Sequence, residues 1–313
     1  MSVTVVGSLA YDAVETPFGK RDRMLGGAAT HFALAASFFD TVHVVGPVGD
    51  DFADEDMAIL ATRGTDVSDV ERVAGGKTFF WAGKYSANLN ERDTLDTQLN
   101  VFESFQPKLS EGSRASEVLF LANIHPDLQY EVRQQCQAAK FVAMDSMNFW
   151  IESTPESLAR TIASVDCLIL NDEEVEQLTG APNLVQGARR VLAMGPSVVV
   201  AKQGKYGAAL FTPREHFWIP AYPLETVADP TGAGDTFAGG FVGAIAAAIG
   251  EGHEIDASFL KQAMAYGTAL ASFNVEEFGT ERVARLTTEE IPGRIRDLQR
   301  ITRFENRPVA LRA

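Results

Sequence analysis

The sequence predicts an α/β fold with three layers, in which helices cover both faces of a mostly parallel central sheet and a small β-lid lies over one edge. Short continuous runs of Val, Ile and Leu alternate along the 313-residue chain with helical patterns. Such runs are typical of parallel strands that are buried on both faces. Residues 8–25 and 77–105 interrupt the alternation with β-rich pieces that lack helical periodicity, and we expect them to form the lid together.

Each expected element is predicted from the spacing of its apolar residues. A short continuous apolar run predicts a buried strand, and apolar residues three to four positions apart predict a helix. The expected strands are 3–6, 42–45, 118–121, 141–144, 167–170 and 198–201. The expected helices are 28–39, 52–63, 128–138, 155–163, 184–193, 237–249 and 263–274. We expect one domain over residues 1–313. Because ligands of such folds bind beyond the carboxyl ends of the strands, the loops that follow the strands are the expected place for a site.

The composition restricts the partners that this chain can have. There are 42 acidic against 27 basic side chains, which gives a net charge of −15. A nucleic acid or an anionic membrane surface requires a basic face, so neither is expected as a partner. An anionic cofactor would need a locally positive pocket, which a helix N-terminus or a bound cation supplies.

Several features predict a cytoplasmic protein. The two cysteines, Cys136 and Cys167, lie in apolar surroundings without the spacing of a metal site or a disulfide framework, as in a reducing cytosol. The N-terminus has no basic region followed by a long apolar stretch. The longest apolar run, 237–249, is too short to span a membrane and is expected to be a core helix.

The most informative stretch of the chain is 228–241. Gly232, Ala233 and Gly234 lead directly into Asp235, where an apolar helical pattern begins. The first turn of a helix has unpaired N–H groups and a partial positive charge, and it therefore binds anions. An aspartate there would repel a phosphate, but it is explained if it removes a proton from a hydroxyl that then attacks the phosphate. The plainer alternative is a glycine-rich helix start with an acidic first turn.

The same stretch resembles the C-terminal motif of the pfkB, or ribokinase-like, carbohydrate kinase family, D-T/P-x-G-A-G-D. The resemblance implies phosphoryl transfer from ATP to an alcohol. It implies that Asp235 is the catalytic base and that the N–H groups of Gly232, Ala233 and Gly234 hold the transferring phosphate. Matches to further family motifs follow one another along nearly the whole chain, and the family has its lid in the same two segments.

The acceptor side of the family site matches two segments of the N-terminal half. Gly26 and Gly27 open a stretch similar to the family's G-G-x-x-x-N-x-A, where two glycines let the backbone approach a polyhydroxy substrate. His31 stands where the family usually has Asn, and it is either a substrate ligand or a packing histidine. Asp12 falls where the family has an aspartate that binds paired hydroxyls, the alternative being a solvated loop residue.

The nucleotide side matches motifs that follow later strands. Asn171 and Glu174 fit the family's N-x-x-E motif, which implies that they organise Mg²⁺ and its waters, and they also fit a helix capping box. Lys202 is a candidate phosphate ligand, with a surface lysine as the alternative. Gly204 and Gly207 match a family turn beside the nucleotide phosphates and also fit an ordinary tight turn.

Three further residues take implied roles from the resemblance. Thr268 and Asn274 lie in the region that lines the adenine slot of the family, although small residues on a helix also indicate close packing. Asp229 falls where family members often bind a monovalent cation, so K⁺ is a candidate cofactor beside ATP and Mg²⁺.

The lid bears on the choice of acceptor. Phe79 and Trp81 alternate along an expected strand and would share one face, on which a nucleobase could stack. This favours a nucleoside acceptor of the adenosine type over a free sugar such as ribose or fructose. The aromatic residues could equally pack the lid or form a homodimer through it. A non-catalytic nucleoside- or sugar-binding relative is the alternative outside enzymes, and the presence of Asp235 and Glu174 disfavours it.

Overall fold

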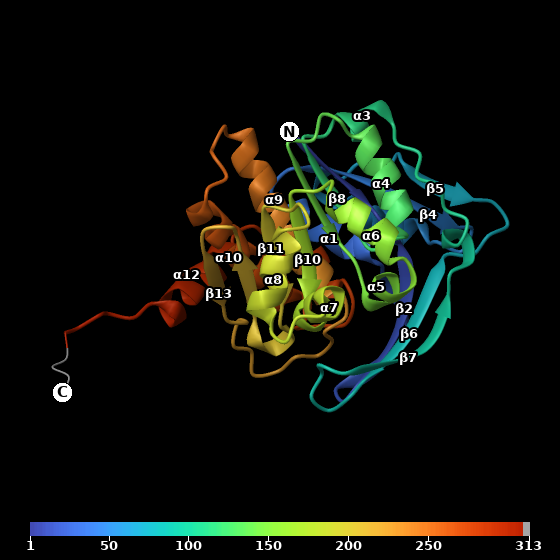
Figure 1. The fold of residues 1–313 in the computed structure, drawn as a ribbon. Coiled ribbons are helices and arrows are strands. Elements are labelled where there is room, and N and C mark those ends of the chain that lie inside the picture. The colour runs from blue at the N-terminus through green and yellow to red at the C-terminus, as the bar shows by residue number, and fades with distance from the viewer. Residues whose placement is uncertain (309–313) are drawn as a thin grey trace.

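The computed structural model describes residues 1–308, and the last five residues of the expected 1–313 domain lie outside the described residues. The three-layer α/β prediction is confirmed: a central sheet lies between two layers of helices, and a second, smaller sheet projects from one side (Figure 1).

The central sheet has nine strands. They are β1 (Ser2–Val6), β4 (Thr41–Gly49), β5 (Val70–Val73), β8 (Val118–Leu121), β9 (Phe141–Asp145), β10 (Cys167–Asn171), β11 (Val198–Lys202), β12 (Ala208–Phe211) and β13 (His216–Ile219). Their order is β13-β12-β11-β10-β9-β8-β1-β4-β5. All pairs from β11 to β5 are parallel, and β12 and β13 add an antiparallel edge. The carboxyl ends of the parallel strands therefore meet at one edge, as the sequence predicts.

Helices cover both faces of this sheet (Figure 1). The larger helices are α1 (Ala28–Ala36), α4 (Pro126–Gln135), α6 (Pro155–Ile162), α7 (Asp172–Thr179), α8 (Leu184–Leu192), α9 (Ala233–Gly250), α10 (Ala257–Asn274) and α12 (Ile291–Thr302). Shorter helices are α2 (Asp54–Leu60), α3 (Glu111–Ala115), α5 (Asn148–Ser153) and α11 (Glu281–Ala284).

Successive side chains of a strand point to opposite faces of the sheet, so they pack into two separate hydrophobic cores. Val118 and Phe120 of β8 pack with α1, α9 and α10, whereas Leu119 and Leu121 pack with α4, α6 and α8. The ring of Phe120 stacks on Phe32 of α1 with centroids 4.3 Å apart. Continuous apolar runs are needed because both faces of each strand are covered.

Every expected strand and helix is present, and the differences lie at their ends. The expected helix 52–63 ends at Leu60, because Arg63 and Gly64 adopt positive φ values of 56° and 78°. The expected helix 263–274 begins earlier, at Ala257, where the side chain of Asp256 accepts a hydrogen bond from Phe259 N and caps the first turn. Periodicity alone does not contain these turn and cap interactions.

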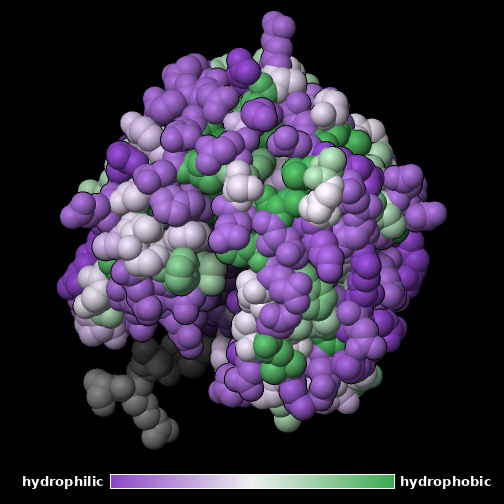
Figure 2. Space-filling view, turned by 90° about the vertical axis from the view of Figure 1, so that its right-hand side faces the viewer, coloured by the Kyte–Doolittle hydropathy of each residue, from purple (hydrophilic) through white to green (hydrophobic). Residues whose placement is uncertain are grey.

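The two segments from which we expect a lid form the second sheet, which is called the lid below. Its strands β2 (Ala10–Thr16), β3 (Gly19–Gly26), β6 (Phe79–Tyr85) and β7 (Arg92–Gln98) lie in the order β3-β2-β6-β7. The parallel pairing of β2 with β6 joins the two segments that are distant in sequence. The side of the molecule that carries the lid is largely hydrophilic, with scattered hydrophobic patches, and it is hollowed in its lower half (Figure 2).

The helix α9 is confirmed as a core helix. It extends beyond the apolar run 237–249, which alone is too short to span a membrane: among residues 1–308 α9 is the one helix long and apolar enough, by length and composition only, to cross one, and 67% of it is buried inside the fold. Its glycines allow very close packing: a Cβ on Gly239 would lie 2.3 Å from the carbonyl oxygen of Phe32 and 2.8 Å from Cβ of Ala35, both in α1.

We therefore expect Gly239→Ala to destabilise the protein by about 1–3 kcal/mol, although alanine is the better helix former by about 1 kcal/mol. Gly250→Ala is the matched control, because a Cβ at that end of α9 meets only the flexible side chain of Met1 at 3.4 Å or more. Urea unfolding followed by circular dichroism measures both. A Gly239→Ala variant as stable as Gly250→Ala would contradict the close contact between α1 and α9.

Candidate active site

The loop 229–235, called the anion loop below, enters α9 in a conformation that requires glycine. Gly232 is the N-cap of α9 with a φ of 72°, and it supplies no side-chain cap. Asp229 connects the loop to the segment at Gly279. Its Oδ1 accepts a hydrogen bond from Thr231 N (2.9 Å), and its Oδ2 accepts one from Gly279 N (3.0 Å). Asp229 is fully buried.

The anion loop leaves several backbone donors free. Ala233 N donates to the carbonyl oxygen of Pro230 at 3.2 Å. Within residues 1–308, the amides of Gly232, Gly234 and Asp235 donate to no protein acceptor. We expect the free amides to be those of Gly232, Ala233 and Gly234. In the structure the amide of Asp235 is free in place of that of Ala233. Together with the positive end of the helix dipole, these amides form an anion site.

The ring of His31 lies directly under this loop. A Cβ on Gly232 would stand 2.3 Å from both Cε1 and Nε2 of His31, so the close approach also requires glycine at position 232. Nδ1 of His31 is 3.1 Å from Oδ1 of Asn274, which also accepts from Thr236 Oγ1 at 3.1 Å. The amide nitrogen of Asn274 donates to the carbonyl oxygen of Thr231 at 2.8 Å.

This network fixes the tautomer of His31. Because the oxygen of Asn274 accepts, Nδ1 of His31 donates and Nε2 carries the lone pair. Burial lowers the pKa of His31, although the charges of Asp235 and Asp229 act in the opposite direction. Nε2 is buried and has no partner among the described residues. The structure thus gives His31 a supporting contact with the loop, and the substrate contact stays a prediction for Nε2.

The expected adenine ligands lie in different surroundings. Asn274 is fully buried, and its amide group is engaged by the network described above. This geometry favours a supporting role for Asn274 over the adenine contact that the resemblance implies. Thr268 is 6% exposed on α10, and its nucleotide contact stays a prediction.

Three carboxylates meet beside the anion loop. Asp235 lies half-buried in the first turn of α9, and its negative charge raises the pKa values of Asp12 on β2 and Asp145 on β9. Asp12 is 5% exposed, and burial raises its pKa to about 7, with further upward contributions from the charges of Asp229 and Asp235. Closely spaced buried carboxylates with raised pKa values are typical of functional sites.

The expected acceptor residues are brought together. A Cβ on Gly26 would lie 2.0 Å from Oδ2 of Asp12, so only glycine leaves room for this carboxylate. Gly27 has a φ of 97°, and a Cβ there would lie 2.5 Å from the carbonyl oxygen of Ser8. These glycines begin α1 and hold its N-terminus against Asp12.

A lysine approaches the anion loop from the sheet. Lys202 ends β11, and a Cβ on Gly234 would lie 3.0 Å from its Nζ. The positive charge of Lys202 acts to lower the pKa values of Asp145 and Glu174, against the larger effect of their burial. The expected phosphate ligand thus lies at the N-terminus of α9.

The N-x-x-E residues form the capping box that the sequence allows. Asn171 N donates to Oε2 of Glu174 at 2.9 Å, and Glu174 N donates to Oδ1 of Asn171 at 2.6 Å. Burial raises the pKa of Glu174. The capping box fixes this carboxylate at the start of α7, at the same sheet edge as Lys202.

The two glycines after β11 turn the chain toward the lid. Gly204 and Gly207 have φ values of 53° and 107°, and a Cβ on Gly207 would lie 2.0 Å from the carbonyl oxygen of Ile219. A Cβ on Gly204 would lie 3.1 Å from Oδ1 of Asn90, which belongs to the connection between β6 and β7. The lid therefore reaches across the site from β2 to this turn.

Sequence reasoning missed three residues of the site. Asp145 is 5% exposed, and its Oδ1 has no partner among the described residues. The sequence could have predicted this residue, because Asp145 directly follows the expected parallel strand 141–144 and ligands bind beyond the carboxyl ends of such strands. The hydroxyl of Tyr85 lies 3.3 Å from Oγ1 of Thr231, and Arg92 acts electrostatically on Asp12. Nothing in the sequence distinguished these two lid residues.

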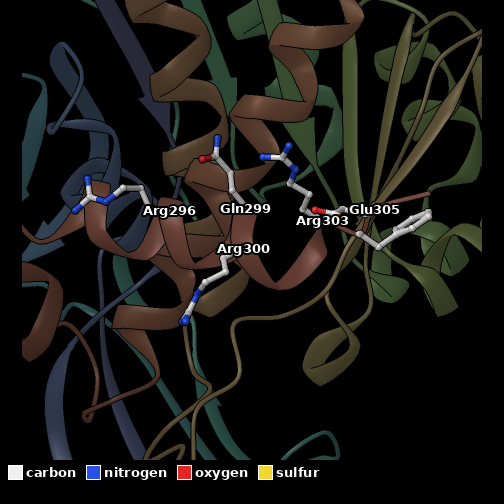
Figure 3. A pocket seen from close by; sticks show the side chains of 6 residues that line it. Arg296, Gln299, Arg300, Arg303 and Glu305 are labelled. Carbon is white, nitrogen blue, oxygen red and sulfur yellow. The ribbon is translucent and has the colours of Figure 1, made fainter. Parts of the chain in front are cut away.

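A separate hollow lies on α12 and the segment that follows it. Figure 3 shows its side chains spread along the helix and pointing in different directions, with no convergence on one point. Its lining is Arg296, Gln299, Arg300, Arg303, Phe304 and Glu305. It contains none of the motif residues, and we assign it no role.

Comparison with known proteins agrees with this geometry. The family model "pfkB family carbohydrate kinase" matches residues 2–285. A cytidine kinase of Thermococcus kodakarensis is 28% identical over 251 residues, which cover 77% of this chain and 87% of the relative. A nucleoside kinase of Methanothermobacter thermautotrophicus is 27% identical over 267 residues, covering 84% and 82%.

A crystal structure of the nucleoside kinase of Methanocaldococcus jannaschii has a TM-score of 0.76 at 20% identity, over 95% of this chain and 98% of that one, and shows the shared fold. The fold and the matches define an ATP-dependent small-molecule kinase, a phosphotransferase with an alcohol acceptor. The chain belongs to the pfkB family of carbohydrate kinases.

The pKa of Asp12 predicts a pH-dependent cost in stability. The folded carboxyl group keeps its proton up to about pH 7, whereas the unfolded one has a pKa of 3.8. The native state therefore binds more protons between these values, and the free energy of unfolding falls as the pH rises through this range. We expect Asp12→Asn to be more stable than the wild type at pH 8 by roughly 2–4 kcal/mol and to differ little at pH 4.

Urea unfolding at both pH values measures this effect. Asp93→Asn, at an exposed position of β7, is the control and should leave the pH dependence unchanged. The free energy of unfolding of Asp12→Asn will still fall somewhat as the pH rises, because the pKa of Asp145 is also raised. An Asp12→Asn variant that is less stable than the wild type at pH 8 would show that Asp12 is not a buried, strained carboxylate.

Proposed function

We propose that this kinase transfers the γ-phosphate of ATP to the primary hydroxyl of a nucleoside. The observation that carries the proposal is the position of Asp235. It lies next to the free amides of the anion loop and within electrostatic reach of Asp12, so a base, an anion site and a hydroxyl ligand share one site.

The residues of the chain have distinct tasks in the transfer. Asp12 accepts hydrogen bonds from paired hydroxyls of the acceptor, beside Gly26 and Gly27. Asp235 takes the proton of the attacking hydroxyl. The amides of Gly232 and Gly234 stabilise the negative charge that develops on the transferring phosphoryl group. The lid excludes water, which limits the hydrolysis of ATP.

The nucleoside preference rests on the inner face of the lid. In the β2–β6 ladder, Ala10 pairs with Phe79 and Asp12 with Trp81, so both aromatic side chains lie on the face of Asp12. Phe79 stacks on Phe102 with centroids 5.5 Å apart and is partly exposed. A base joined to a ribose held by Asp12 can stack on this surface. Relatives named cytidine kinase and nucleoside kinase support the same acceptor class. The alternative acceptor is a free sugar.

The binding sites for Mg²⁺ and K⁺ are likewise proposals. Among residues 1–308 no group of three or more His, Cys, Asp or Glu side chains could hold a metal ion. Mg²⁺ that arrives on the nucleotide keeps several waters and needs few protein oxygens, and Glu174 fits as a ligand through water. When bound, Mg²⁺ neutralises phosphate charge. Asp229 is the proposed ligand of K⁺, and its bracing of the anion loop supports a link between that ion and the loop.

Other expectations stay predictions. These are a cytoplasmic location, a homodimer through the lid, and the absence of nucleic-acid and membrane partners.

We expect Asp235→Asn to lower kcat by about 10²–10⁴-fold and to leave the affinity for ATP within about threefold of the wild type, because the amides of the anion loop remain. Glu251→Gln, at the other end of α9, removes the same charge far from the site and is the control. Steady-state kinetics and calorimetry with ATP measure both effects. A near-normal kcat in Asp235→Asn would overturn the assignment of the base.

A panel of acceptors tests the substrate class. We expect turnover of ATP with nucleosides, with the phosphate on the primary hydroxyl of the ribose as seen by ³¹P NMR. Ribose and fructose should react at least about tenfold less efficiently, since they lack the base that stacks on the lid. Turnover with fructose but with no nucleoside would establish the free-sugar alternative. Absence of any product would favour the non-catalytic alternative.

A further inference from the structure

Thr231 of the anion loop is held by three different parts of the fold. Its N–H donates a hydrogen bond to Oδ1 of Asp229 at 2.9 Å, and its carbonyl oxygen accepts one from Nδ2 of Asn274 on α10 at 2.8 Å. Its hydroxyl donates to the hydroxyl oxygen of Tyr85 on the lid strand β6 at 3.3 Å. The loop and α10 therefore fix the backbone of Thr231, and the lid fixes its side chain.

The ring of Tyr85 is fixed by packing. Tyr85 is 7% exposed and lies in a small hydrophobic cluster with Val14 of β2, Met24 of β3 and Phe278. Ala228, which directly precedes the anion loop, packs against the same cluster. The lid and the start of the loop thus share one set of apolar contacts, from which the hydroxyl of Tyr85 reaches the loop. Removal of this hydroxyl alone leaves the apolar contacts in place.

A second hydrogen bond joins the lid to the same segment. Oγ1 of Thr16, at the end of β2, donates to the carbonyl oxygen of Ala228 at 2.9 Å. This bond fixes the chain where it approaches the anion loop. The bond of Tyr85 instead acts directly beside Gly232, whose free amide belongs to the anion site. Of the two bonds, the one of Tyr85 is therefore placed to orient a phosphate donor.

The orientation of Gly232 depends on its neighbours. Glycine has more allowed backbone conformations than other residues, and Gly232 adopts a φ of 72°. Its N–H must point at a phosphoryl oxygen to stabilise charge there, because hydrogen bonds weaken steeply as they bend. A contact that fixes the side chain of the preceding residue, Thr231, limits the directions in which this amide can point.

We propose that Tyr85 is a positioning residue, which acts through Thr231 to hold the anion loop in its phosphate-binding conformation. The link needs the lid in place over the site, because Tyr85 belongs to the lid and Thr231 to the loop before α9. Asp12, the proposed ligand of the acceptor, lies in the same lid sheet. The acceptor side of the site is thereby connected to the phosphate donors. The inference rests on the proposed kinase reaction.

Tyr85→Phe and Thr231→Val each remove this bond and nearly keep the shape of the side chain. We expect either variant to lower kcat by about 5–50-fold and to change the KM of the acceptor less than about twofold, because the loop is misplaced while the acceptor ligand is kept. Thr231→Ser keeps the hydroxyl and should recover most of the loss. The double variant should be no worse than the poorer single variant, since both remove one interaction.

Tyr130→Phe is the matched control. Tyr130 lies on α4, where its ring packs against the guanidinium of Arg160, and loss of its hydroxyl should leave kcat within about twofold of the wild type. Losses in the double variant that multiply, a kcat of Tyr85→Phe within twofold of the wild type, or an equal loss in Tyr130→Phe would overturn the role of Tyr85.

Amide hydrogen exchange in the free protein tests the link without any acceptor. We expect Tyr85→Phe to speed exchange in residues 229–235 and Thr231→Val to speed exchange in residues 79–98, because each side of the link stabilises the other. Faster exchange confined to the substituted segment would overturn the link. A wild-type protein that phosphorylates no acceptor would overturn the proposed function, while the exchange measurement would still decide whether Tyr85 holds the anion loop.

Discussion

The close parallel contact between α1 and α9 organises the site. Gly232, Gly239 and Gly243 of the anion loop and α9 meet successively later residues of α1 and of the turn that follows it, namely His31, then Phe32 and Ala35, then Ala36 and Phe39. The two helices therefore run in the same direction and begin at the same edge of the sheet. One N-terminus carries the acceptor glycines and the other carries the anion loop. Because each N-terminus has a partial positive charge, their alignment adds to the charge of Lys202 and gives a locally positive region in a protein of net charge −15.

That field also explains why carboxylates can gather there. Asp12, Asp145 and Asp235 repel one another, and burial adds to the cost of their charges. Backbone amides and Lys202 offset only part of this cost. A phosphate and its cations would change the balance when they bind, since they occupy the space around which the acids, amides and Lys202 are arranged. The free protein therefore stores unfavourable electrostatic energy in the groups proposed to bind substrate, as expected of residues placed for chemistry rather than for stability.

Local patterns predicted those parts of the molecule that depend on local physics. Strand runs such as 118–121 were predicted to the residue, because continuous burial leaves an uninterrupted apolar sequence. The anion loop was predicted because its glycines and Asp235 are adjacent in the chain. Asn274 was assigned to the adenine slot, but its partners Thr231 and His31 lie 43 and 243 residues away. Arg92 gave no signal at all, since its position depends on a strand pairing between the two lid segments.

The site combines residues of the core with residues of the lid. Lys202 and the amides of α9 belong to the core and are present whether or not the acceptor is bound. Trp81, Tyr85 and Arg92 belong to the lid, and β2 supplies Asp12 from the same sheet. The proposed acceptor ligand and the cover of the site therefore belong to one sheet, so that binding of the alcohol and exclusion of water would be connected mechanically. The sheet that would bind the alcohol is then also the one that would exclude water.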